Sequence, residues 1–131
     1  MAMTIEQARQ AIIARMVAFT GIEQKFIRYP NKTFTPPESG LWCHVNIIYG
    51  RSMIAGLADT PLMRRTGNLN IQCFARKNTG DNALTILGDA LLAHFEAYRF
   101  DQLEFTSGEV IDAGEDDDFV QYNVVIGFRV N

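Results

Sequence analysis

The sequence predicts an α+β domain in which two helices cover one face of a sheet of about four mainly antiparallel strands. Apolar residues recur at helical spacing near the start of the chain and again from residue 84, whereas four other segments alternate apolar and polar residues as half-buried strands do. The connections within each pair of strands are short, which favours hairpins. The expected architecture is a two-layer sandwich with the element order αββαββ.

The first helix is expected to begin at residue 5. Thr4 and Gln7 have the spacing of a capping box, in which each side chain bonds to the backbone N–H of the other residue. We expect Gly21 to end the helix by adopting the left-handed conformation. Apolar residues line one face of this segment: Ile5, Ala8, Ile12, Met16 and Phe19.

A proline-rich stretch separates this helix from the first main strand. Residues 22–29 are expected to be a short extended segment, and residues 29–40 include three prolines and a glycine, which exclude a helix or a central strand. Phe34 lies in the middle of the loop and is expected to anchor it. The strand that follows, residues 41–49, alternates Leu41, Cys43, Val45, Ile47 and Tyr49 with Trp42, His44, Asn46 and Ile48.

The next connection, residues 50–63, is unusually apolar for a loop. Such side chains need cover, and two answers are open: packing on the subunit's own sheet, or burial against another subunit. The large apolar residues of this connection are Met53, Ile54, Leu57, Leu62 and Met63.

The second strand follows Arg64 and Arg65, which are either solvated or paired with acidic groups of a neighbouring subunit. The turn Thr79-Gly80-Asp81 then leads into the second helix, whose stripe is Leu84, Leu87, Leu91, Phe95 and Tyr98. Within the strand, Leu69, Ile71, Cys73 and Ala75 alternate with Asn68, Asn70, Gln72 and Phe74.

The last two strands form a hairpin. Leu103 and Phe105 begin the third main strand, and Ser107-Gly108 predicts a bulge or bend in it. The final strand alternates from Val120 to Val130. Four acidic residues form the expected hairpin tip, where a solvated turn, a weak divalent-ion site and a subunit contact remain open: Glu115, Asp116, Asp117 and Asp118.

Length and composition predict a single domain over residues 1–131. Hydrophobic residues make up 47% of the chain and charged residues 21%, which argues against global disorder. The net charge of −3 disfavours a protein that tracks nucleic-acid phosphates. The sequence has no recognisable signal peptide and no apolar run of the roughly 20 residues that span a bilayer, and it has only two cysteines. These observations predict a cytoplasmic protein with reduced thiols and no membrane partner.

No motif assigns a reaction, a cofactor or a metal. Cys43 and Cys73 both fall on core-facing strand positions, where a thiol behaves as a small apolar group, although a disulfide or a catalytic role stays open. His44 and His94 lack metal-ligand spacing. We therefore expect no catalytic residue, no cofactor and no metal ligand, with a small hydrolase or ligand-binding domain based on Cys43, His44 or the acidic tip as the rival interpretation.

The outward face of the sheet is the more informative feature. It is rich in amides and nearly free of charge, as the centres of protein interfaces tend to be. With the apolar connection it supplies the candidate subunit contacts: Trp42, Met53, Ile54, Leu57, Leu62, Met63, Arg64, Arg65, Asn68, Asn70, Gln72 and Phe74.

Two segments resemble bacteriophage tail terminator-like proteins, the tail completion proteins of long non-contractile tails. Residues 28–37, RYPNKTFTPP, followed by Leu41-Trp42-Cys43-His44-Val45, are similar to their WPN..F.PP…W..V segment. Residues 65–74, RTGNLNIQCF, with Gly80, are similar to their R.G.L.IQ.F…G strand and turn. The family often has Trp where this chain has Tyr29.

The resemblance implies a non-enzymatic virion protein of a phage or prophage. Such proteins form a hexameric ring on the tail tube, end its growth and prepare the tail for joining the head. The implied partners are other copies of the chain, the tail-tube protein and head–tail connector proteins, while DNA passes without specific binding. The implied location is the host cytoplasm during assembly and then the virion tail. A connector or tail-tube subunit on the same fold is the alternative.

Overall fold

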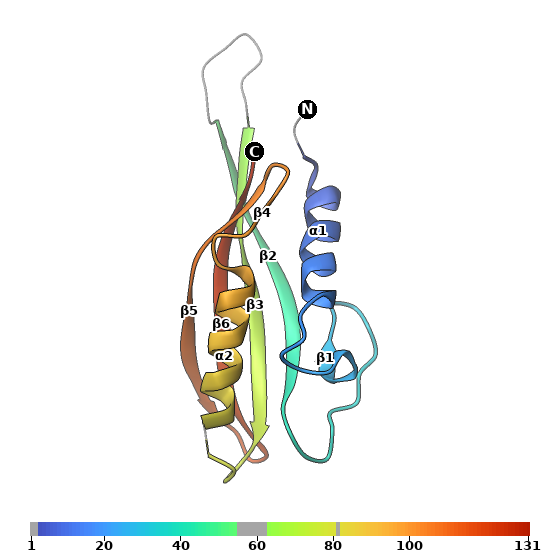
Figure 1. Cartoon of the computed structure of the whole chain (residues 1–131), viewed down its shortest axis with the longest axis vertical. Helices are drawn as coiled ribbons and strands as arrows, with labels where there is room; N and C mark the ends of the chain where they lie inside the picture. The colour runs from blue at the N-terminus through green and yellow to red at the C-terminus, as the bar shows by residue number, and fades with distance from the viewer. Residues whose placement is uncertain (1–2, 55–62, 81) are drawn as a thin grey trace.

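The structure, a computed structural model, describes residues 3–54, 63–80 and 82–131. Figure 1 shows long, twisted strands side by side, with α2 in front of them and α1 along one side. The elements in chain order are α1 (Ile5–Val17), a 3-10 turn (Gln24–Phe26), β1 (Ile27–Arg28), β2 (Trp42–Ile54), β3 (Met63–Arg76), α2 (Asn82–Phe95), β4 (Arg99–Phe100), β5 (Leu103–Glu115) and β6 (Phe119–Val130).

The predicted fold class is wrong in its sheet and in its element order. Instead of a two-layer sandwich with about four antiparallel strands in the order αββαββ, the chain forms a six-stranded half-barrel sheet with the order β1-β2-β3-β6-β5-β4. The sheet is mixed, because β1 runs parallel to β2. The additional strands, β1 and β4, have two residues each, which is too short to produce a recognisable alternation.

The strand β3 is the centre of the sheet. It pairs antiparallel with β2 from Trp42↔Phe74 onward and with β6 from Arg65↔Val130 to Arg76↔Phe119. The strands β5 and β6 form the expected hairpin, and its register shifts between Phe105 and Gly108. The predicted irregularity at Ser107-Gly108 is therefore confirmed.

The strands β2 and β3 reach further than predicted. Residues 50–54 and 63 were expected to be part of a connection, but Ile54 pairs with Met63 and Met53 pairs with Arg64. A register shift between Tyr49 and Ser52 interrupts the pairing, and this irregularity hides the continuation of the strand from the sequence pattern. Leu57 and Leu62 lie outside the described residues.

The start of α1 is as predicted, and its end is not. Thr4 accepts a hydrogen bond from the backbone N–H of Gln7, and the Gln7 side chain accepts one from the N–H of Thr4, which confirms the capping box. The helix ends at Val17, and Ala18 follows in the right-handed conformation. Gly21 is not among the glycines with positive φ, so the predicted glycine closure is wrong.

The C-terminal ends of the two helices are bound to each other by two side chains. The Arg15 guanidinium donates to the carbonyl of His94 at 3.1 Å from Nε and 2.6 Å from Nη2. In return, His94 Nε2 donates to the carbonyl of Arg15 at 2.7 Å. Carbonyls in the last turn of a helix lack partners within that helix, so each helix satisfies an end group of the other.

One core cluster joins both helices to the sheet. Ala8, Ile12 and Met16 of α1 are fully buried in it, as are Leu84, Leu91 and Phe95 of α2. The alternate residues of the central strands complete it from the sheet side: Cys43, Val45, Leu69, Ile71, Cys73, Ala75, Val124, Ile126, Phe128 and Val130.

Gly67 occupies a point in β3 where a side chain would collide with the core. A Cβ there would lie 2.5 Å from the carbonyl oxygen of Ile48 and 2.5 Å from Cζ of Phe128. We expect Gly67→Ala to lower the free energy of unfolding by about 1–3 kcal/mol through overpacking, measured by urea denaturation.

Gly127→Ala is the matched control on the neighbouring strand. A Cβ at Gly127 meets the Thr106 hydroxyl, the end of a side chain that can rotate away, so we expect a smaller loss of stability. Equal losses in the two variants would contradict the assignment of the Gly67 effect to packing.

Candidate subunit interface

The face of the sheet away from the helices carries an array of uncharged residues, most of which are polar. Across β2, β3 and β6, one row aligns His44, Gln72 and Asn123, and the next aligns Asn46, Asn70 and Val125. Ile48 and Asn68 continue the array toward the hairpin end of β2 and β3. This surface is the one that the alternation predicts.

The polar groups of this face bond to one another. Gln72 Oε1 accepts from Asn46 Nδ2 at 3.4 Å and lies 3.1 Å from His44 Nδ1. Since Gln72 Oε1 can only accept, His44 presents its Nδ1–H to it. Asn70 Oδ1 is buried and has no hydrogen-bond partner among the described residues. The side chains of His44, Asn46 and Gln72 are thus held together in the isolated subunit.

His44 is held in its neutral form. Desolvation lowers its pKa below 6.5, and the positive charge of Arg28 lowers it further, while the bond to Gln72 opposes both effects. A neutral imidazole keeps this row free of charge near pH 7.

Trp42 and Phe74, which we predicted as subunit contacts, pack against their own subunit. Trp42 is only 7% exposed, and its ring stacks on that of Phe74 with 4.1 Å between centroids. Phe34 lies 5.3 Å from the Trp42 ring, so this residue anchors the proline-rich loop as expected. Arg76 donates to the carbonyl of Pro37 at 2.7 Å and ties the same loop to β3.

The other predicted contacts have varied surroundings. Arg64 is bound within the subunit, donating to Asn131 Oδ1 at 2.6 Å, and Arg65 is half-buried. Asn68 is exposed, while Asn70 and Gln72 are half-buried in the array. Met53, Ile54 and Met63 lie on strands, but their side chains are outside the described part of the structure.

The acidic tip is a turn built by one of its own carboxylates. Asp116 Oδ1 accepts from the backbone N–H of Phe119 at 2.7 Å and of Asp118 at 2.8 Å. These two bonds lower the pKa of Asp116. Glu115, Asp117 and Asp118 are exposed around it. Within the described ranges no group of three or more His, Cys, Asp or Glu side chains is arranged to hold a metal ion.

The two cysteines belong to the core. Cys43 and Cys73 face each other across β2 and β3, are fully buried, and have their sulfurs 3.9 Å apart as free thiols. The contact with Cys43 and burial both raise the pKa of Cys73, which disfavours the nucleophilic thiolate. His44 projects to the opposite face of the sheet, so it does not pair with Cys43.

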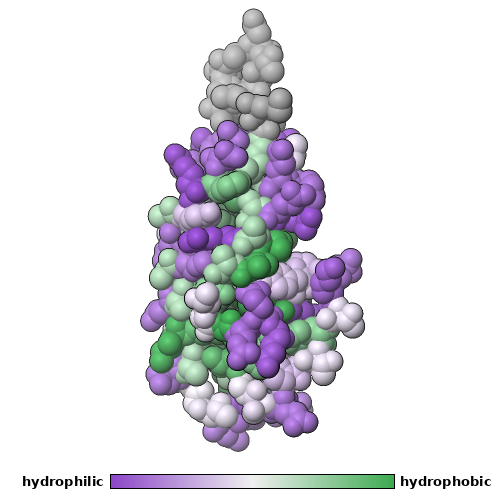
Figure 2. Space-filling model, turned by 45° about the vertical axis from the view of Figure 1, so that its right-hand side comes forward, coloured by the Kyte–Doolittle hydropathy of each residue, from purple (hydrophilic) through white to green (hydrophobic). Residues whose placement is uncertain are grey.

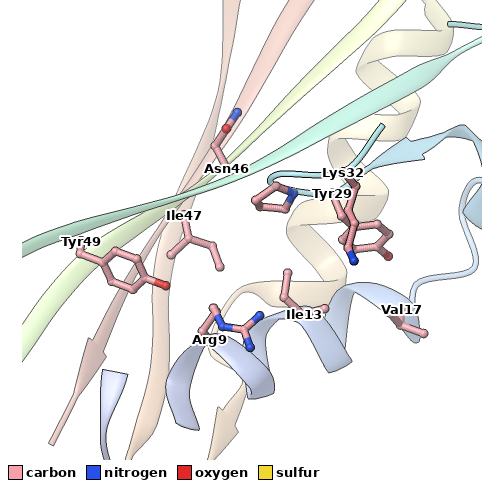
Figure 3. A pocket seen from close by; sticks show the side chains of 9 residues that line it. Arg9, Ile13, Val17, Tyr29, Lys32, Asn46, Ile47 and Tyr49 are labelled. Carbon is pink, nitrogen blue, oxygen red and sulfur yellow. The ribbon is translucent and has the colours of Figure 1, made fainter. Parts of the chain in front are cut away.

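A hollow between α1 and β2 was not predicted from the sequence. It has a volume of about 580 Å³ and is the space between the side chains labelled in Figure 3. Ile13 and Val17 line it from α1, and Ile47 and Tyr49 line it from β2; Arg9, Tyr29, Pro30, Lys32 and Asn46 complete the lining. The view that brings this side of the molecule forward shows apolar patches between hydrophilic residues (Figure 2).

A weak sequence signal for the hollow exists in α1. Ile13 and Val17 are spaced by four residues and fall beside the buried stripe of Ala8, Ile12 and Met16. Val17 remains 54% exposed. Apolar residues next to a complete stripe indicate a second contact surface, but the partner across the hollow comes from β2, which the helical pattern does not reveal.

Comparisons with known proteins show the fold alone. No protein-family model matches the sequence, and no curated protein matches it. A solved structure superposes on this chain with a TM-score of 0.75 at 16% sequence identity, and the superposition covers 98% of this chain and 96% of the other. Among the described residues, no helix has the length and apolar character needed to cross a membrane.

The lowered pKa of His44 predicts acid sensitivity. The imidazole takes up a proton more readily in the unfolded chain, where its pKa is near 6.5, than in the folded one. Stability is therefore complete above that pH and falls as the pH drops below it. We expect His44→Gln to reduce the loss in free energy of unfolding between about pH 7 and pH 5, measured by urea denaturation. An unchanged pH profile would contradict this assignment.

The burial of both thiols predicts that they do not react in the native protein. We expect Cys43 and Cys73 to resist Ellman's reagent at pH 8 and to react fully in denaturant, because reaction requires an exposed thiolate. Rapid labelling of either thiol in the native state would contradict their place in the core.

Proposed function

We propose that this chain is a non-enzymatic tail terminator, a structural protein that caps a phage tail tube as a hexameric ring and prepares the tail for joining the head. The observation that carries the proposal is the pre-ordered, uncharged amide array on the outer face. Surfaces that desolvate in protein contacts are depleted of charge at their centre. The side chains of His44, Asn46 and Gln72 are held by one another, so little of their freedom is lost when a partner covers them.

Two further features support this proposal. The segments around Pro36-Pro37 and Gly67 resemble those of tail terminator-like proteins. In this chain the first segment packs Phe34 against Trp42, and the second has close packing at Gly67. A net charge of −3 suits a ring whose lumen lets DNA pass without binding it.

A different class of function has one specific observation in its favour. The hollow of about 580 Å³ falls within the range of small-molecule sites, so a ligand-binding domain is the second candidate. A head–tail connector or a tail-tube subunit is the alternative within the virion class. These possibilities differ in stoichiometry and in the object that the protein binds.

Assembly on a tail tube tests the proposal. The protein is mixed with tubes of the tail-tube subunit from the same genome and examined by electron microscopy and light scattering. We expect six subunits at the end of each tube and an arrest of tube growth. A strict monomer that leaves tube length unchanged would overturn the proposal, and incorporation along the tube would favour the tail-tube alternative.

A single charge on the amide array sharpens this test. Gln72→Glu keeps the oxygen that accepts from His44 and Asn46, so we expect the variant to fold while tube-end binding weakens at least tenfold because a carboxylate must be desolvated. Thr85→Glu, on the exposed side of α2, is the control and should bind as the wild type does.

A further inference from the structure

The sheet has two edges that its short strands leave open. The strand β1 pairs only with Cys43 and His44 of β2, and β4 pairs only with the first two residues of β5. Within the described residues, no strand lies beside Val45–Tyr49 of β2 or beside residues 109–113 of β5. Open edges present unpaired backbone groups to any strand that approaches.

The β2 edge lacks the usual protection of such edges. Its residues 45–49 include no charge and no proline, which are the common means of preventing pairing. Ile48 is 52% exposed and Tyr49 is 43% exposed. The hollow between this strand and α1 lies directly along the edge, lined by Ile47 and Tyr49 (Figure 3).

The β5 edge is acidic and has defined limits. Gly108 donates its N–H to the carboxylate of Glu96, and Gly114 donates its N–H to that of Asp112. The backbone N–H groups on both sides of residues 109–113 are therefore already bonded to side chains. Between these points, Ile111 is 42% exposed on the outer face. Two β5 edges would repel each other, because each carries Glu109 and Asp112.

The directions of the strands allow the two edges to join. Each neighbouring pair in the series β2, β3, β6, β5 is antiparallel, so β5 runs opposite to β2 within a subunit. When a second copy lies beside the first in the same orientation, its β5 therefore meets β2 as an antiparallel strand. Repetition of this head-to-tail contact closes a ring if the rotation between copies permits.

We propose that β5 of one copy adds to the open edge of β2 of the next copy, with Ile111 opposite Ile48, and so extends the sheet from subunit to subunit. This inference rests on the proposed function in that the chain assembles with itself. Both isoleucines are on the outer face, where they cover each other. In this register Val110 lies opposite Tyr49 on the helix side, an aromatic and β-branched pair.

The hollow and the local charges fit this occupant. Val110 and Asp112 share the helix side of β5. Val110 packs beside Gly88 of its own α2, whereas Asp112 is exposed and in the joined sheet faces the hollow. Arg9 is already paired with Glu6, whereas Lys32, on the rim, has no carboxylate partner among the described residues. Lys32 is thus available to the acidic β5 edge, which makes β5 a better occupant than a second β2 edge.

Disulfide trapping between separately made variants tests the contact and its direction. Ile48→Cys and Ile111→Cys proteins are mixed under mild oxidation, since directly opposed residues of antiparallel strands are close enough to form a disulfide. We expect a crosslinked dimer in the mixture at least ten times as abundant as in either protein alone. The native thiols do not interfere, because both are buried.

Control variants and the assembly assay separate the outcomes. Ile86→Cys, 61% exposed on α2, should not crosslink above background with either partner. Crosslinking of Ile48→Cys alone would overturn the proposal in favour of a symmetric β2 contact, and no crosslink in any combination at millimolar protein would also overturn it. A six-membered ring without the mixed crosslink refutes this strand contact and leaves the proposed function intact, whereas a mixed crosslink without tube capping supports the contact and refutes the terminator.

Discussion

The double pairing of β3 is the constraint on which the rest of the structure depends. Because β3 bonds to β2 on one side and to β6 on the other, its register decides which face of three strands meets the helices. A slip by one residue would turn Leu69 and Ile71 outward and place Asn70 in the core. At one end this register requires Gly67, because a Cβ there would collide with Phe128, and at the other end Trp42 stacks on Phe74.

The register of β3 also determines which residues form the amide array on the outer face. The same alternation that buries Cys73 presents Gln72 beside Asn46 and His44, so the amide array and the core have a common origin. In contrast, the two thiols are packed in the core. At the acidic tip, the carboxylate of Asp116 bonds to the backbone of its own turn. Among the described residues, the polar groups that remain for contact with a partner lie on the outer face and at the sheet edges, which is the basis for the assembly role that we propose.

The spacing of apolar residues predicted those helices and strands that are long enough to show a regular pattern. The alternation from Leu69 to Ala75, the capping box at Thr4 and the hairpin tip at Asp116 are local signals, and each appears in the structure. The strands β1 and β4 depend on partners elsewhere in the fold and are too short for a pattern. The hollow escaped prediction for the same reason, since its lining residues from α1 and from β2 come together only after α1 packs beside β2.

The reciprocal bonds between Arg15 and His94 have a consequence for the order of folding on the ribosome. The two residues are 79 positions apart, so α1 is synthesised long before the carbonyl and imidazole that hold its end exist. The apolar face of α1 is buried only when β2, β3, β5, β6 and α2 have also been made, because these elements form the core with it. A helix of 13 residues is marginal by itself in water. Although α1 is made before these strands and α2, it is thus among the last of these elements to become stable, and its apolar stripe is open to chaperones until they are made.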